Sequence, residues 1–96
     1  MRMSTRSRYG LRFMVYLGSK FEQGPIHLNE IAENEQISEK YLEQIVPYLR
    51  SAGIVNSQRG NAGGYRLSKS PDEISLKEII EPLEGNLSLV DCNKNN

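Results

Sequence analysis

The sequence predicts an α+β domain that is mostly α: a winged helix-turn-helix with a three-helix core, a two-stranded wing and one following helix. Two short helical patterns meet at a tight turn near residue 37. A glycine-rich hairpin pattern over residues 54–68 follows directly. The order helix, helix, hairpin is typical of a winged helix, and 96 residues suit a single domain.

The first helix is expected to run from a cap at Ser4 or Thr5 to about Phe21. Gly24 and Pro25 then end it, and residues 26–28 are compatible with a very short strand. Apolar residues at helical spacing predict a broad inward face, made by Leu11, Phe13, Met14, Val15, Tyr16, Leu17 and Gly18.

The second helix is short, and Asn29 is its expected cap. Gln36 stands in the turn, where a left-handed conformation would cost a non-glycine residue on the order of 1 kcal/mol. Ser38 follows as the cap of the third helix. The inward face of the second helix is expected to be Leu28, Ile31 and Ala32.

The third helix, over residues 38–52, is the segment around which the domain is organised. Lys40, Glu43 and Gln44 fall away from its apolar stripe. They would either face base edges in a DNA major groove or form an ordinary solvated surface. Pro47 lies inside the helix and predicts a bend after these residues. The stripe itself repeats at three- and four-residue steps: Leu42, Ile45, Val46 and Leu49.

The hairpin predicted over residues 54–68 has a glycine-rich tip that carries Arg59 and Asn61. An arginine in this position can enter the narrow, electronegative minor groove of DNA. Two other interpretations of the tip are a simple flexible turn and a phosphate-cradling loop. The second is disfavoured because the lysine and the following helix of a P-loop are absent.

A last helix is predicted from the pair Ser75 and Glu78, which match a capping box. Pro82 is expected to end or kink this helix. Its inward face is expected to be Leu76, Ile79, Ile80 and Leu83.

Charge is distributed unevenly, although the formal net charge is zero. Residues 1–20 carry five basic residues and no acidic one, and residues 47–69 carry four basic residues and no acidic one. The intervening residues 21–46 carry six acidic residues and one basic residue. If the two basic blocks meet on one face of the domain, they would form a phosphate-binding footprint.

Within the first basic block, Arg6, Arg8 and Tyr9 would contact DNA phosphates, or the block would be a solvated basic terminus. An enzyme is not expected, because the sequence offers no nucleophile–base pair, no paired carboxylates in a cleft and no metal-ligand cluster. The single cysteine excludes an internal disulfide. No membrane span or secretory signal is recognisable, so a cytoplasmic location is expected.

Three stretches resemble the Rrf-type winged helix-turn-helix transcription regulators, the IscR-, CymR- and NsrR-like family. They are RYGL from residue 8, ISEKYLEQIVPYLRSAGIV from residue 37 and RGNAGGYRLSKSPDEISLKEII from residue 59. YLEQ followed by RGxxGGY is the specific part, and the resemblance covers residues 2–92. It implies a homodimeric bacterial regulator of transcription, such as a repressor, that binds a partly palindromic double-stranded DNA operator. The acidic residues leave open a winged-helix module that binds proteins instead of DNA.

The resemblance also implies which residues contact DNA. Glu43 would accept from cytosine, and Gln44 would bond adenine in bidentate fashion. Arg59, on a wing spanning residues 59–65, would reach the minor groove. The complete expected set is Arg6, Arg8, Tyr9, Ser38, Lys40, Tyr41, Glu43, Gln44, Arg59 and Asn61.

Members of the family usually continue with a long helix that pairs two protomers, so this chain resembles a regulator truncated after its DNA-binding domain. That domain is expected over residues 1–84, and residues 85–96 would be a polar tail. Cluster-binding members carry three cysteines after the domain, and Cys92 matches the first. Cys92 is a candidate metal ligand or a free thiol. A cluster usually needs four protein ligands, so an iron–sulfur cluster is expected only in a longer native chain.

Overall fold

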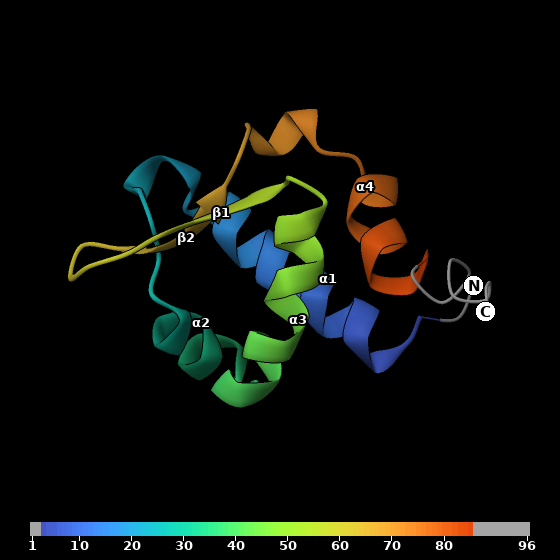
Figure 1. Cartoon of the computed structure of the whole chain (residues 1–96), viewed down its shortest axis with the longest axis horizontal. Helices are drawn as coiled ribbons and strands as arrows, with labels where there is room; N and C mark the ends of the chain where they lie inside the picture. The colour runs from blue at the N-terminus through green and yellow to red at the C-terminus, as the bar shows by residue number, and fades with distance from the viewer. Residues whose placement is uncertain (1–2, 86–96) are drawn as a thin grey trace.

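The computed structural model describes residues 3–85 and has the predicted winged helix-turn-helix architecture (Figure 1). Candidate residue Cys92 lies outside the described residues. A three-helix core is followed by an antiparallel hairpin and a short helix. The helices and strands are α1 (Thr5–Ser19), α2 (Leu28–Glu35), α3 (Glu39–Ser51), β1 (Val55–Gln58), β2 (Gly64–Leu67) and α4 (Leu76–Ile80). Three further turns are helical: Phe21–Gln23, Pro71–Glu73 and the π-helical turn Glu81–Gly85.

Serine side chains begin three of the four α-helices, as the sequence predicts. Ser4 accepts from the backbone N–H of Ser7, and Ser38 accepts from that of Tyr41. Ser75 forms a capping box with the third residue of α4. Because each cap satisfies a backbone N–H that has no partner within its own helix, it defines where the helix starts.

The expected cap of α2 was wrong by two positions. The cap residue is His27, whose side chain makes no capping bond, and Asn29 lies inside the first turn. Ile26 is paired with Tyr65 through two backbone hydrogen bonds of 2.8 Å, as an isolated β-bridge. The chain is therefore held in an extended conformation up to residue 26 and turns into the helix directly afterwards.

The core is built from the inward faces of the helices and the base of the hairpin. All four predicted stripe residues of α3 are buried, with at most 2% of their surface exposed. Two predictions were wrong: Val15 is 62% exposed and Leu76 is 57% exposed. The buried stripe of α1 follows residues 10, 13, 14 and 17, which leaves position 15 at its edge. Leu76 begins α4, whose stripe runs through Ile79 towards Leu83.

The turn between α2 and α3 contains Gln36, which is the one non-glycine residue with a positive φ among residues 3–85. Gln36 adopts the predicted left-handed conformation, with φ 56° and ψ 47°. Arg12 of α1 binds this turn: its Nε lies 3.2 Å from the Glu35 carboxylate, and its Nη2 donates to the Glu35 carbonyl. α1 therefore holds the end of α2 and, through it, the start of α3.

The hairpin has the predicted antiparallel pairing, from Val55 opposite Leu67 to Gln58 opposite Gly64. α3 continues without a break across Pro47, and α4 ends at Ile80, two residues before Pro82. None of the helices among residues 3–85 is long and apolar enough to cross a lipid bilayer.

A polar cluster ties the end of the described chain to α1 and α3. Glu84 Oε2 accepts from the backbone N–H of Ser4 at 3.0 Å and from the buried Ser7 hydroxyl at 2.5 Å. The Arg6 guanidinium donates to the Leu83 carbonyl at 2.8 Å and to the Tyr48 hydroxyl at 2.9 Å. The hydrogen bonds from Ser7 and Ser4 lower the pKa of Glu84 below its ordinary value of 4.5.

This lowered pKa gives a pH-dependent contribution to stability. The folded-state pKa of Glu84 lies below the unfolded value, so its contribution is present above about pH 4.5 and is lost as the pH falls through the folded pKa. We expect Glu84→Gln to lower the melting temperature at pH 7 and to reduce its fall between pH 5 and pH 3, which thermal melts in the two conditions measure. The control Glu81→Gln should keep the wild-type acid dependence, because within residues 3–85 the Glu81 carboxylate pairs only with Lys77, at 3.7 Å. Equal acid dependence in both variants would refute this role for Glu84.

Candidate nucleic-acid interface

The N-terminal half of α3 presents the predicted reading residues to solvent. Lys40, Glu43 and Gln44 are exposed, whereas Leu42 and Ile45 between and beside them are buried. The Ser38 cap is exposed at the start of the helix. This half of α3 therefore carries a polar face that no other element covers within residues 3–85.

The first turns of α1 lie beside the start of α3 through two tyrosines. The Tyr9 and Tyr41 rings meet edge to face, with centroids 5.5 Å apart and planes at 85°. The guanidinium groups of Arg8 and Arg12 lie 5.9 Å and 5.5 Å from the centre of the Tyr9 ring. Arg8 is exposed, so its charge is held next to α3 and remains accessible.

Arg6 is placed differently from Arg8, although both lie in the first turns of α1. Its guanidinium carbon lies 4.4 Å from the centre of the Tyr48 ring, in addition to its two hydrogen bonds. Arg6 is half-buried and occupied by these internal contacts. These contacts give Arg6 a structural role between α1, α3 and the turn Glu81–Gly85, and its contact with a DNA phosphate stays a prediction.

The tip of the hairpin is anchored to the helix-turn-helix. His27 Nε2, at the start of α2, lies 3.0 Å from the Asn61 carbonyl. Because a carbonyl only accepts, the ring nitrogen must donate there. Arg59 and Asn61 remain exposed at the tip. The bond restrains the tip beside the element that also positions α3, and a contact between residues 34 positions apart has no local signal in the sequence.

Figure 1 shows how these parts are arranged: α2 and the hairpin lie on one side of α3, and α4 lies on the other. The predicted residues Arg8, Tyr9, Ser38 and Tyr41 gather around the start of α3, with Lys40, Glu43 and Gln44 on its exposed face. Arg8, Lys40 and Arg59 form no ion pair with any residue in the described range. The exposed acidic side chains of Glu39 and Glu43 lie among them on α3, so the surface has mixed charge.

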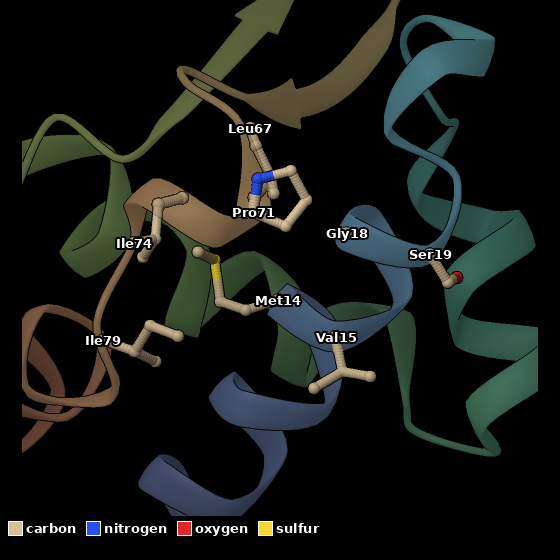
Figure 2. Close-up of a pocket in the computed structure, with 8 residues that line it drawn as sticks. All are labelled: Met14, Val15, Gly18, Ser19, Leu67, Pro71, Ile74 and Ile79. Carbon is tan, nitrogen blue, oxygen red and sulfur yellow. The ribbon is translucent and has the colours of Figure 1, made fainter.

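A groove lies where α1 meets the end of β2, the turn Pro71–Glu73 and α4. This groove of about 380 Å³ is lined almost entirely by apolar side chains, and α3 contributes nothing to it (Figure 2). Its lining is Met14, Val15, Gly18, Ser19, Leu67, Pro71, Ile74 and Ile79. It offers no base and no paired carboxylates, so it lacks the groups that acid–base catalysis needs.

The part of the chain in the structure also lacks a metal centre. No group of three or more His, Cys, Asp or Glu side chains is close enough among residues 3–85 to hold a metal ion. These residues therefore do not fit an iron site or an iron–sulfur cluster.

The matching family and the curated relatives CymR and IscR are all transcriptional regulators. A family described as "Rrf2: Iron-dependent Transcriptional regulator" matches residues 3–96. The HTH-type transcriptional regulator CymR of Bacillus subtilis is 48% identical over 91 residues, which are 95% of this chain and 66% of that protein. The HTH-type transcriptional regulator IscR of Aliivibrio salmonicida is 37% identical over 92 residues, 96% of this chain and 55% of that protein.

Solved structures agree with the sequence matches. The structure of CymR, the global cysteine regulator of B. subtilis, has a TM-score of 0.86 and 48% identity, and the match covers 94% of this chain and 70% of that one. A T. potens IscR structure has a TM-score of 0.83 and 45% identity, covering 91% and 64%. The chain thus spans 66% or less of the length of the two curated relatives named above.

Proposed function

Because the chain belongs to the Rrf2 family of transcriptional regulators, we propose that it binds double-stranded operator DNA and thereby controls transcription. One observation carries this proposal: the domain presents two segments that can contact DNA, the exposed face of α3 and the tip of the hairpin. The exposed face of α3 carries Lys40, Glu43 and Gln44, and the tip carrying Arg59 is held to the start of α2 by His27. The family is one of regulators rather than enzymes, and relatives named as HTH-type regulators favour DNA over a protein-binding role.

The proposed contacts follow from the chemistry of each exposed side chain. In the major groove, the Glu43 carboxylate accepts from cytosine N4, and the Gln44 amide pairs with the adenine edge. Arg59 enters the minor groove, whose negative potential is highest where it is narrow. Arg8 binds a phosphate beside the start of α3, where Tyr9 holds it.

This assignment predicts that Glu43→Ala and Arg8→Ala weaken DNA binding in different ways. The probe is a duplex selected by the protein from a random-sequence library, together with its single-base variants. Glu43→Ala should remove about 1–3 kcal/mol of discrimination at one base pair. Arg8→Ala should weaken all duplexes alike and reduce the slope of log K against log salt by about 1.

Band shifts over a range of salt concentrations measure both effects. If the two variants weakened every duplex equally, Glu43 would not be a reader. If no duplex were enriched from the library even at low salt, the DNA-binding proposal itself would fail, and recovery of a protein partner would favour the other function.

We also propose that the regulator acts as a homodimer on a partly palindromic operator, in the bacterial cytoplasm where chromosomal DNA lies. Sedimentation should find two chains on each operator duplex, and one chain per duplex would contradict this.

An iron–sulfur cluster would need ligands beyond Cys92, because the chain has one cysteine and residues 3–85 offer no site. The chain mixed with iron and sulfide without oxygen should therefore show no cluster absorbance; a stable cluster spectrum would contradict that expectation.

A further inference from the structure

A polar groove lies where the end of α3 meets the outer face of the hairpin. It has a volume of about 480 Å³, and none of its lining residues is acidic. Arg50 enters it from the last turn of α3, and Arg66 enters it from β2. The remaining lining comes from β1: Val55, Asn56, Ser57 and Gln58. Apart from Val55, the groove is thus lined by cations and neutral polar groups, which is a composition that suits an anion.

Neither arginine side chain has a partner among residues 3–85. The side chains of Arg50 and Arg66 form no hydrogen bond or ion pair there. The guanidinium groups of Arg6 and Arg12, by contrast, donate to Tyr48, Leu83 and Glu35. A cation in the last turn of α3 complements the carbonyl end of the helix, which accounts for Arg50 but not for Arg66. Two like charges lining one groove repel each other, and an anion bound between them offsets this repulsion because it attracts both.

Arg50 lies on the same side of α3 as the proposed base readers. It follows Glu43 by seven residues, which is close to two helical turns and therefore returns to the same face. Seven residues advance about 10 Å along the helix axis. The major groove of B-DNA is about 12 Å wide, so a side chain displaced this far from a base reader reaches the bordering phosphates.

The position of Arg66 follows from the register of the hairpin. Ser57 pairs with Tyr65, whose ring packs against Phe13 in the core with centroids 6.1 Å apart. The next pair, Asn56 with Arg66, must point to the opposite face because side chains alternate along a strand. The groove therefore continues the exposed surface of α3 onto the outer face of the wing.

We propose that the Arg50–Arg66 groove binds phosphates of the DNA backbone that borders the major groove occupied by α3, an inference that rests on the function proposed above. Arginine suits this role because its planar fork of donors matches two phosphate oxygens. Asn56 and Gln58 supply neutral donors beside it. These contacts set the position and tilt of the protein on the duplex and add affinity that does not depend on base sequence.

The test uses the full chain and the duplex that it selects from a random-sequence library. The double variant Arg50→Gln, Arg66→Gln should reduce the slope of log K against log salt by about 2, one for each lost phosphate contact. The matched control Lys69→Gln, Lys77→Gln removes two cations outside the groove, which are paired with Glu78 and Glu81. It should leave the slope unchanged. Thermal melts check that both variants are folded.

Duplexes in which one phosphate is replaced by a neutral methylphosphonate then locate the contact. At the phosphates that the groove binds, this replacement should weaken binding of the wild-type protein. The same replacement should leave binding of the double variant unchanged, because that variant has already lost the contact. If the double variant bound with the wild-type slope and the wild-type interference pattern, the inference would be overturned while DNA binding itself stood. If inorganic phosphate shifted the Nε resonances of both arginines and the slope did not change, the groove would hold a free anion instead, which also overturns the inference. If no duplex were selected at all, the proposed function would fail first.

Discussion

Replacing Gly64 with alanine is expected to lower the free energy of unfolding by about 3 kcal/mol or more. Gly64 has a φ of 137°, which L-residues rarely adopt. A Cβ added there would also lie 2.3 Å from the Ile26 carbonyl oxygen, a backbone atom that cannot turn aside. The clash would break the bridge between Ile26 and Tyr65, and with it the link that joins the hairpin to the segment before α2.

Denaturant unfolding measures this effect, and Gly53→Ala is the matched control. Gly53 has a φ of 79°, but a Cβ there would meet nothing within 4 Å. Its substitution should cost only about 1 kcal/mol, the conformational term alone. If the two variants were equally destabilised, the close approach of Gly64 to Ile26 would not be what requires glycine there. Arg59 sits on the hairpin that this approach positions, so Gly64→Ala should also weaken DNA binding.

Replacing Leu42 with alanine is expected to cost about 2–5 kcal/mol of stability, because its side chain is fully buried and its removal leaves a cavity. Gln44, two positions along the same helix, is exposed. Gln44→Ala should change stability by no more than about 0.5 kcal/mol. It should instead lower the preference for an adenine at one operator position.

The comparison separates packing from recognition on one short helix. Denaturant unfolding gives the stability of each variant, and binding to single-base variants of the selected duplex gives the preference. If Gln44→Ala destabilised the protein as much as Leu42→Ala, or left base preference unchanged, the division of α3 into a buried face and a reading face would be wrong.

Several features of the fold could be predicted because their signals are local. The stripe of α3 repeats within thirteen residues, and its exposed face is what remains. The caps at Ser4, Ser38 and Ser75 each bond a backbone N–H three residues away, so side chain and partner lie in one short segment. The hairpin tip is marked by its glycines. The resemblance of the YLEQ and RGxxGGY motifs to Rrf-type regulators added a family, which the match over residues 3–96 bears out.

Other features depended on contacts that no local pattern reports. Arg6 and Arg8 are two residues apart and have the same chemistry, yet Arg6 is occupied by Leu83 and Tyr48, while Arg8 stays exposed. Val15 looked as apolar as its neighbours, but no element among residues 3–85 covers it enough to bury it.

The sequence alone determined the order of the helices, the hairpin that follows them and the face of α3 that turns outward, because periodicity and capping act over a few residues. The tertiary structure decided which charged side chains have partners among residues 3–85. It places Arg50 and Arg66 in one groove. It also forms the hydrogen bonds from His27 to the Asn61 carbonyl at the wing tip and from Ser7 to Glu84. Those partners are 16, 34 and 77 positions apart, and only packing of the whole core sets the distances between them.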